Sequence, residues 1–575
     1  MKKIVILLTL NTFLITAFNL HAQDNEGGKP YSFDLGLSDD LTPYVITPAF
    51  DFAPLIALSE ERVKQGTFEL TDKLFESDYD LTNSGAWTES ANGGRVWKLK
   101  ITSPGAKRIR LYYKNFHLPE GAKLFVYNEN RTEEIGAFTS KNNDEADSNE
   151  GIFSTDHLTG DVQIVEYYEP QNVRGQGHFS IFRVAHQFKS VASAESCQVD
   201  VMCPDGTNWQ NQKEGVVRIY VVIGTTPSNT TAGYCSGSLV NNTALDCKKY
   251  ILTAMHCSLD ESVSPGVETI YYNQWVFSFD YQKTGCAAGT ALANKTKTGC
   301  QKRAGANDDG GATGSDFLFL EMTAPAFPTG VTPYYNGWTH AAAATAGGTG
   351  IHHPSGDCKK ISTFITTPTS TSWGGNVSDT HWQFAWEAGH GSTEPGSSGS
   401  PVFNSSGLIF GTLTGGGSCC VVDGCGWQTG DSPNGPTYKD AYGKMAYHWT
   451  SDGTTAPLQL KPWLDPISSN VTVLTGSFNP CATGISEAGS FNSIVVYPNP
   501  ANGSFNVSIE SGKANDIDIS VFDIVGQMVS YKKIENPFGG TFNFNLADRA
   551  SGIYFVYVKM KNETAVRKII LTNEE

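Results

Sequence analysis

The chain has 575 residues, a length typical of about three or four domains, and 39% of them are apolar, which allows a sizeable core. Its formal net charge is −17 and no stretch is rich in Lys and Arg, which argues against nucleic acid or anionic membrane surfaces as partners. The 59 glycines and the many Val, Thr, Tyr and Phe residues favour strands joined by turns, so we expect an all-β protein.

The first residues, MKKIVILLTLNTFLITAFNLHAQ, place two lysines before an apolar run that ends at the small residue Ala22. This pattern is typical of a secretory signal peptide, which we expect to span residues 1–22 and to be cut after Ala22. No other stretch is apolar and long enough to span a bilayer. We therefore expect a soluble, exported mature protein.

Residues 23–189 contain no cysteine and several segments with the alternation and β-branched or aromatic content of strands. Examples are RVWKLKITSPG, RIRLYYKNF, KLFVYNEN and HFSIFRVAHQF. We predict a β-rich N-terminal domain that ends near HQFKSVASAESC.

Residues 190–475 hold eleven of the 12 cysteines, between many short predicted strands. In an exported protein this distribution predicts a disulfide framework within one domain. The dense segment CCVVDGC leaves a metal site as the alternative, but no spacing matches a paired zinc knuckle. The adjacent His352 and His353 are interpreted as part of a structural turn, and we expect no metal and no cofactor.

Residues 476–488 are rich in Ser, Gly, Asn and Thr and are predicted to form a linker. Residues 489–575 contain about six or seven further predicted strands, among them SIVVYPNP, GSFNVSIES and GIYFVYVKM. Their number and spacing predict a small β-sandwich.

The segment TEPGSSGSPVF contains the candidate nucleophile Ser398. A serine hydroxyl needs a base, and the base needs an orienting carboxylate. His256 follows the predicted strand YILTA, and Asp316 precedes the apolar run FLFL. Taken singly, these residues could equally belong to a Ser/Gly loop, a structural histidine and a strand-edge turn. Their order along the chain, His, Asp, Ser, is that of chymotrypsin-like proteases.

The motifs around these residues resemble that family. LTAMHC looks like Thr-Ala-Ala-His-Cys, and GSSGSP looks like Gly-Asp-Ser-Gly-Gly-Pro. The resemblance is closer to bacterial lysyl endopeptidases, through SCQVDVMCPDG, CSGSLVNNTALD, SDFLFLEM, HHPSGDCKKIS, TEPGSSGSPVF, DAYGKM and WLDP, in that order, over about residues 196–468. It implies a double β-barrel and a secreted serine endopeptidase that cuts protein and peptide substrates after lysine through an acyl-enzyme. It also implies an oxyanion hole formed by the backbone N–H groups of Gly396 and Ser398.

Substrate specificity is open from the residues alone. Ser392 occupies the place of the trypsin specificity aspartate, and the nearby acidic candidates are Glu394, Asp423, Asp431 and Asp440. The resemblance selects Asp440, because lysyl endopeptidases carry their specificity aspartate in an Asp-x-Tyr-Gly-Lys/Arg segment, here DAYGK. A carboxylate at the base of a pocket discriminates strongly for a buried cation.

The resemblance also implies that Trp373 lies beside the active site, where the family stacks it on a histidine. The matching position here is Thr414, and this departure puts a strict preference for Lys over Arg in doubt. Three disulfides are implied in the same way: Cys197–Cys420, Cys203–Cys286 and Cys235–Cys257. The remaining cysteines cannot be paired from sequence; they are Cys247, Cys300, Cys358, Cys419, Cys425 and Cys481.

The residue before the nucleophile is the uncharged Ser397, so the zymogen switch of trypsin is not possible here. Residues 23–189 are therefore the expected inhibitory propeptide, and self-cleavage is expected after Lys189. The tail resembles the C-terminal sorting domain of type IX secretion, through VVYPNPANGSFNV, DIVGQMV, GIYFVYV and VRKIIL. This implies contact with that secretion machinery and release or attachment outside the cell; an accessory binding sandwich is the alternative.

Two other functions remain open for the whole chain. One is a broader protease that cuts after both Lys and Arg. The other is an inactive protease-like adhesin or binding module, against which the intact His, Asp and Ser argue.

Overall fold

The structure is a computed structural model that describes residues 25–572 except 35, 37–38, 40, 66, 91, 192, 261–264, 288, 376, 421–434, 484–493, 511–515, 525–526, 536–538 and 561–562. The chain divides into two compact units, Met1–Phe478 and Asn479–Glu575. The predicted signal peptide and its cleavage point at Ala22 lie outside the described residues.

The N-terminal region of the first unit is a β-sandwich. A six-stranded sheet, in the order β1-β4-β10-β6-β7 with β3 beside β4, packs on β5 and β11 of a second sheet. Trp97, Leu124 and Tyr167 from the first sheet share a buried core with Leu111 and Val184 from the second. The strands of the first sheet are β1 (Tyr44–Ile46), β3 (Ala86–Glu89), β4 (Arg95–Thr102), β6 (Lys123–Asn128), β7 (Glu134–Phe138) and β10 (Val162–Glu169).

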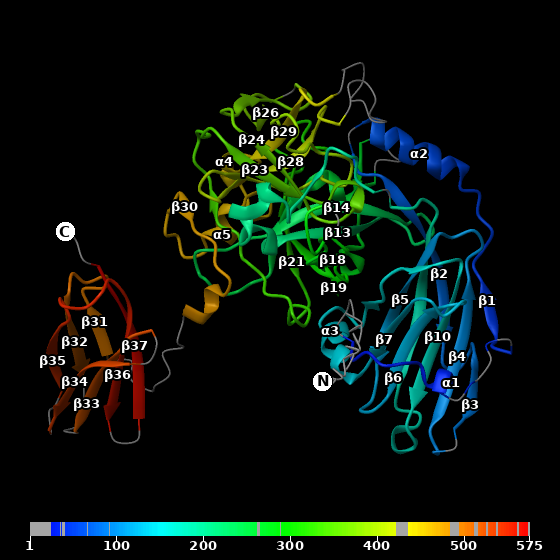
Figure 1. Cartoon of the computed structure of the whole chain (residues 1–575), viewed down its shortest axis with the longest axis horizontal. Helices are drawn as coiled ribbons and strands as arrows, with labels where there is room; N and C mark the ends of the chain where they lie inside the picture. Colours follow the sequence, from blue (N-terminus) through cyan, green and yellow to red (C-terminus); the bar gives the residue numbers. More distant parts are fainter. Residues whose placement is uncertain are drawn as a thin grey trace, which may run out of the picture. The chain divides into compact units, whose positions relative to one another are not determined.

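The second sheet has twelve strands and continues without a break from the N-terminal region into the cysteine-rich region. The junction is the antiparallel pair β2–β14, in which Lys73 lies opposite Thr231 and Asp72 opposite Ala232 (Figure 1). Its strands are β2 (Leu70–Asp80), β5 (Arg108–His117), β8 (Phe153–Ser154), β9 (Leu158–Thr159), β11 (His178–Gln187), β13 (Val216–Ile223), β14 (Thr231–Leu239), β15 (Tyr250–Ala254), β18 (Val276–Phe279), β19 (Lys295–Thr298), β20 (Cys300–Gly305) and β21 (Phe317–Met322).

A third sheet of ten strands forms the other half of the cysteine-rich region. Leu252 and Phe319 from the twelve-stranded sheet share a buried core with Ile351, Phe403 and Ile409 from this sheet, so two antiparallel sheets pack face to face. The predicted all-β, chymotrypsin-like class is confirmed. The strands are β12 (Val199–Asp200), β22 (Trp338–Thr339), β23 (Gly348–His352), β24 (Lys360–Phe364), β25 (Thr369–Thr371), β26 (His381–Ala385), β27 (Pro401–Asn404), β28 (Ile409–Gly416), β29 (Lys439–Lys444) and β30 (Val473–Leu474).

The α-helices among the described residues are short. A turn of helix was predicted within residues 460–467, and α5 forms there. The helices are α1 (Tyr31–Asp34), α2 (Ala53–Lys64), α3 (Asn143–Asp147), α4 (Met445–Thr450) and α5 (Lys461–Leu464); a small hairpin, β16 (Leu259–Asp260) and β17 (Val267–Glu268), completes this unit.

The second unit is a small β-sandwich, as predicted. One sheet has the order β31-β32-β35 and the other β34-β33-β36-β37. Phe505 and Phe544 from the first sheet pack with Ile519, Val556 and Ile569 from the second. The strands are β31 (Ile494–Tyr497), β32 (Ser504–Glu510), β33 (Ile517–Phe522), β34 (Met528–Ile534), β35 (Gly539–Asn545), β36 (Gly552–Met560) and β37 (Glu563–Leu571).

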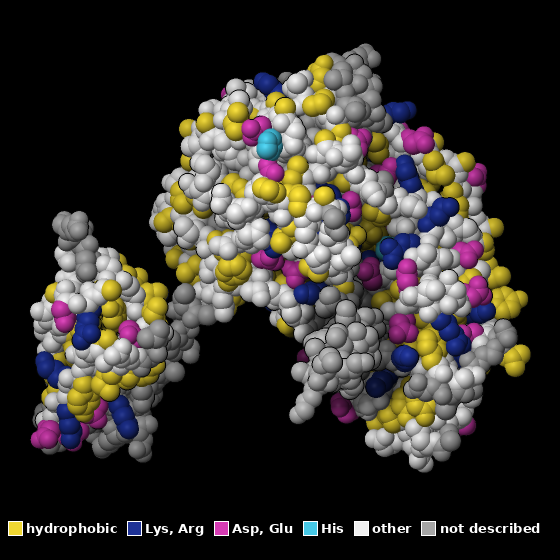
Figure 2. Space-filling model, in the orientation of Figure 1, with side chains coloured by type: hydrophobic (Ala, Val, Ile, Leu, Met, Phe, Trp, Pro, Cys, Tyr) yellow, Lys and Arg dark blue, Asp and Glu magenta, His cyan; other side chains and the backbone are white. Residues whose placement is uncertain are grey.

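Acidic and basic side chains are intermingled on the face of the N-terminal region that Figure 2 shows. An even distribution of both signs differs from the single basic face of a nucleic-acid-binding surface. Among the described residues, the helices are all too short or too polar to pass through a bilayer.

Candidate active site

Strand pairing brings His256 and Asp316 together. β15 and β21 are antiparallel, with Ala254 at the end of β15 opposite Phe317 at the start of β21. His256 follows β15 in a single turn of 3₁₀ helix, Met255–Ser258, and Asp316 immediately precedes β21. The two residues therefore leave the same end of one strand pair.

The contact between them is double and buried. Nδ1 of His256 lies 2.7 Å from Oδ2 of Asp316, and the His256 backbone N–H donates to Oδ1 at 2.9 Å. The exposed fractions of the two residues are 2% and 0%. This arrangement fixes the orientation of the imidazole ring, which is what an orienting carboxylate does in a catalytic triad.

Ser398 lies in the turn that precedes β27 and is 4% exposed. Its carbonyl oxygen accepts the N–H of Ser236 in β14 at 2.8 Å and lies 3.9 Å from the sulfur of Cys257, the neighbour of His256. A methyl group added at Gly399 would lie 2.1 Å from Oγ1 of Thr253. The turn that carries Ser398 therefore packs directly on the strand end that carries His256.

The backbone of this turn has the form that an oxyanion hole requires. Gly396 has a φ of 98°, a left-handed conformation that favours glycine. Within the described part of the chain, the N–H groups of Gly396 and Ser398 donate no hydrogen bond to another residue. Both groups are available for a ligand oxygen, as was expected of these two residues from the sequence.

Ser397 is held by a histidine whose role the sequence did not reveal. His352, at the end of β23, places Nδ1 2.8 Å from Oγ of Ser397 and Nε2 3.1 Å from Oγ of Ser362. Burial lowers the pKa of His352 to about 3, so the ring is neutral. A neutral hydrogen bond thus supports the residue before the nucleophile, where trypsin-like zymogens use a charged aspartate.

The structure contains three disulfides in the cysteine-rich region: Cys197–Cys420, Cys203–Cys286 and Cys235–Cys257. The last joins β14 to the turn that carries His256. Cys247, Cys419 and Cys481 are also disulfide-bonded, whereas Cys300 and Cys358 are free, buried thiols. Cys425 lies outside the described residues.

Loss of the Cys235–Cys257 bond should destabilise the fold. The bond closes a loop with a sequence separation of 22 residues, which corresponds to about 3 kcal/mol in the chain-entropy account of disulfides. We expect a Cys235→Ser/Cys257→Ser chain to unfold at a clearly lower urea concentration than its parent, both carrying Ser398→Ala to prevent self-digestion. Cys358→Ser is the control, since it removes a thiol and no bond. Equal unfolding midpoints for the double variant and the parent would contradict the expected contribution.

Asp440, in β29, is fully buried and bound by four neutral donors. Its Oδ2 accepts Nε1–H of Trp386 at 2.6 Å, the hydroxyl of Thr393 at 2.7 Å and the hydroxyl of Ser418 at 2.6 Å. Its Oδ1 accepts the N–H of Ser418 at 3.0 Å. Burial raises the pKa of Asp440, although these hydrogen bonds oppose the shift. Thr393 and Ser418 belong to the segments on either side of the pocket expected next to Ser398.

The other acidic candidates differ from Asp440. Glu394 accepts hydrogen bonds from Gln198, Ser355 and the backbone of Glu195, and it ties the nucleophile segment to the start of the cysteine-rich region. Asp423 and Asp431 lie outside the described residues.

Trp373 does have a histidine neighbour, but from an unexpected position. The ring centroids of Trp373 and His381 are 6.2 Å apart, with the rings tilted by 37°. Nε2 of His381 lies 3.0 Å from Oγ1 of Thr414, and Nδ1 lies 2.7 Å from Oγ1 of Thr380. Burial lowers the pKa of His381 to about 4. The histidine that Thr414 lacks is thus replaced in space by His381 from the neighbouring strand β26, which sequence position alone could not indicate.

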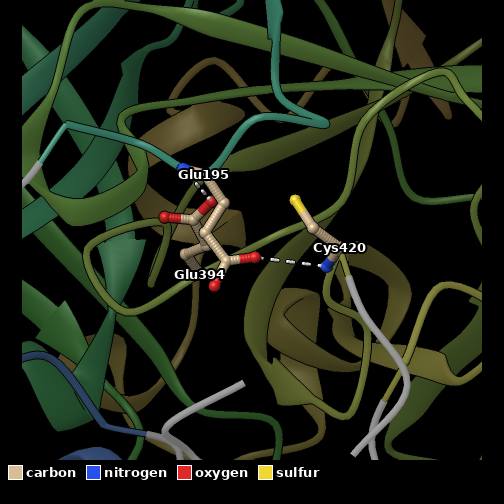
Figure 3. Close-up of side chains that lie close together, drawn as sticks. All are labelled: Glu195, Glu394 and Cys420. Carbon is tan, nitrogen blue, oxygen red and sulfur yellow. Dashed lines mark hydrogen bonds between the residues drawn. The ribbon is translucent and has the colours of Figure 1, made fainter. Parts of the chain in front are cut away.

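Glu195, Glu394 and Cys420 lie close together, as Figure 3 shows. The sulfur of Cys420 is bonded to Cys197 and is not a thiolate, and the carboxylates accept backbone N–H groups of Cys420 and Glu195. These contacts explain the cluster as a structural clasp between the two ends of the cysteine-rich region.

Lys189 lies where the N-terminal region meets the cysteine-rich region. The N–H groups of Phe188 and Lys189 donate to the carbonyl oxygen of Thr71 in β2, so the chain stays paired with β2 up to this point. The ammonium group of Lys189 forms an ion pair with Glu69, and its side chain is 39% exposed.

Three family models match the chain. The lysyl endopeptidase N-terminal domain matches residues 76–188, and the lysyl endopeptidase C-terminal domain matches residues 191–429. The secretion system C-terminal sorting domain matches residues 495–572. The first two matches lie on either side of Lys189, and the third lies within the C-terminal sandwich.

Individual proteins give one informative match. A lysyl endopeptidase of Pseudomonas aeruginosa is 25% identical over 367 residues, which cover 60% of this chain and 74% of that protein. A solved structure of a Glu endopeptidase in complex with MPD is 13% identical and covers 46% of this chain and 91% of its own, with a TM-score of 0.24. The BSP domain of a biofilm-associated protein is 9% identical and covers 90% and 70%, with a TM-score of 0.12. Neither structural likeness is strong enough to support a conclusion.

The sorting domain directs the protein to the cell surface or the extracellular space by type IX secretion. From its matched N- and C-terminal domains, the chain belongs to the lysyl endopeptidase family and is a secreted serine endopeptidase.

Proposed function

We propose that the chain hydrolyses peptide bonds on the carboxyl side of lysine, with Ser398 as nucleophile, His256 as general base and Asp316 as the carboxylate that orients it. In this mechanism Oγ of Ser398 bonds to the substrate carbonyl carbon while His256 takes the hydroxyl proton. His256 then protonates the leaving amine, and water releases the acyl group by the reverse sequence. The double contact between His256 and Asp316 supports these roles.

The proposed oxyanion hole consists of the N–H groups of Gly396 and Ser398. These donors would stabilise the negative oxygen of the tetrahedral intermediate, and loss of one such donor typically costs about 10²–10³-fold in rate. The positive φ of Gly396 supports this role, because it turns the local backbone sharply before the nucleophile.

The observation that carries lysine specificity is the uneven use of the two Asp440 oxygens. Oδ2 already accepts three hydrogen bonds, whereas Oδ1 accepts one. A carboxylate oxygen has about two lone-pair sites, so Oδ2 has no site left for a substrate. An arginine fork needs both oxygens, whereas the compact lysine ammonium can bind through Oδ1 alone.

Gly416 keeps this oxygen accessible. A methyl group added at Gly416 would lie 2.1 Å from Oδ1 of Asp440, so a larger side chain would occupy the place of the substrate ammonium. Glycine at this position and the saturated Oδ2 together favour lysine over arginine.

Matched peptides that differ only in Lys or Arg before the cleaved bond test the proposal. We expect kcat/KM for the lysine peptide to exceed that for the arginine peptide by at least tenfold, and mass spectrometry of a digested, denatured protein should find cuts after lysine. Equal rates would instead identify a broader Lys/Arg protease, the second candidate. A covalent serine reagent confirms in the same sample that the enzyme is active.

We further propose that residues 1–22 are a signal peptide, 23–189 a propeptide, 190–475 the protease domain and 489–575 the sorting domain, with 476–488 as linker. Cleavage after Lys189 by the enzyme itself would remove the propeptide. The partial exposure of Lys189 supports its access to a second enzyme molecule. The mature chain should then begin at Ser190 or nearby.

A further inference from the structure

A buried aspartate outside the proposed triad lies directly behind Asp316. Asp308 is in the loop that joins β20 to β21, and it is 4% exposed. Its Oδ2 accepts the backbone N–H of Asp316 at 2.7 Å, and its Oδ1 accepts the N–H of Gly311 at 3.1 Å. One carboxylate therefore holds both the middle and the end of the loop.

This contact acts on an unusual backbone conformation. Asp316 has a φ of 59°, in the left-handed region that non-glycine residues seldom adopt. Such a conformation persists only where surrounding contacts hold it. The hydrogen bond from the Asp316 N–H to Asp308 is one such contact, and the two carboxylate contacts with His256 are the others.

The loop that Asp308 closes also packs on the histidine. A methyl group added at Gly310 would lie 3.1 Å from Cβ of His256. A methyl group at Gly311 would lie 3.2 Å from Cβ of Asp316 and 3.2 Å from Cδ1 of Trp373. A shift of this loop would therefore move the surroundings of His256 and Asp316 together.

A second carboxylate supports the same loop from the other side. Asp452 follows α4 and accepts the N–H of Ser315 at 3.0 Å and its hydroxyl at 2.5 Å. A methyl group at Gly314 would lie 2.6 Å from Oδ2 of Asp308 and 2.5 Å from Oδ1 of Asp452, so the two carboxylates converge on this glycine.

We propose that Asp308 is a positioning residue of the active site, which holds Asp316 against His256 and contributes negative charge to that pair. This inference rests on the proposed triad. It adds a buried carboxylate that touches neither substrate nor reacting atoms and acts through Asp316.

The charged groups around Asp308 determine the sign of its effect. It faces Asp316 on its own loop, His256 on the turn after β15, and Asp452 and Tyr447 at the end of α4. Burial raises the pKa of Asp308 to about 6, with the charge of Asp316 adding to the shift and that of His256 opposing it. Because the interaction is mutual, an ionised Asp308 stabilises the protonated imidazole of His256.

Asp308→Asn removes this charge and places an amide where two N–H groups need acceptors. Per active site labelled by a serine reagent, we expect kcat to fall about tenfold with little change in KM. We also expect the acidic limb of the pH profile of kcat/KM to move by about half a pH unit or more to lower pH, because His256 protonates less readily. Asp309→Asn is the matched control, since that neighbouring carboxylate is exposed and should leave both values unchanged.

Asp308→Glu provides the second variant, which retains the charge but displaces the two oxygens. It should lower kcat while its acidic limb stays near that of the parent. An Asp308→Asn profile equal to the parent's per labelled site would overturn the proposal, as would an Asp308→Glu enzyme with the parent's kcat. Failure of the proposed triad would be distinguishable, because the parent itself would then not be labelled at Ser398.

Discussion

Ser398→Ala should abolish proteolysis by the purified chain, with kcat reduced by about 10⁴–10⁶-fold. Alanine keeps the turn and its packing on β14 but removes the only oxygen that can form the acyl-enzyme. The residual rate would come from the oxyanion hole and binding alone. The measurement is the release of a chromogenic leaving group from a lysine substrate.

The same variant tests self-processing. If the chain removes its own N-terminal region, pure Ser398→Ala protein should remain intact, and addition of a trace of parent enzyme should cut it after Lys189. Ser397→Ala is the matched control, because it changes the neighbouring hydroxyl and should retain measurable hydrolysis. Full processing of pure Ser398→Ala chain would contradict self-cleavage, and full activity would contradict the nucleophile.

Asp440→Asn should reduce kcat/KM for lysine substrates by about 10³-fold. The substrate ammonium would then enter a buried pocket without a negative charge, and an unpaired buried ion costs several kcal/mol. The amide nitrogen would also face donors, since Trp386, Thr393 and Ser418 all donate to this side chain. Kinetics on matched Lys, Arg and Leu peptides would measure the change.

The effect should be confined to specificity. Labelling of Ser398 by a small serine reagent should stay close to that of the parent, because the reagent does not need the pocket. Asp379→Asn is the control: Asp379 is exposed and has a φ of 63°, which asparagine tolerates. An Asp440→Asn enzyme that retains its preference for lysine would show that another group recognises the substrate.

The sequence predicted the strand ends that carry His256 and Asp316, because apolar runs mark buried strands. Two adjacent antiparallel strands then suffice to bring their ends together, as the opposition of Ala254 and Phe317 does here. Local patterns therefore predicted a large part of the candidate site.

Other parts depend on contacts between segments far apart in sequence. His381 takes the place of the histidine absent at position 414, although the two positions lie on different strands, β26 and β28. The support of Ser397 by His352 likewise joins two loops. A short polar residue in a loop has no periodicity, so Asp308 could not be distinguished in sequence from its exposed neighbour Asp309.

The continuity of β2 with β14 has a consequence for processing. Hydrolysis of one peptide bond after residue 189 would break the covalent link but none of the ladder between these strands. The products would remain a nicked, noncovalent pair until that ladder separates or the N-terminal fragment is itself digested. A denaturing gel would therefore report the cut earlier than an assay that depends on dissociation.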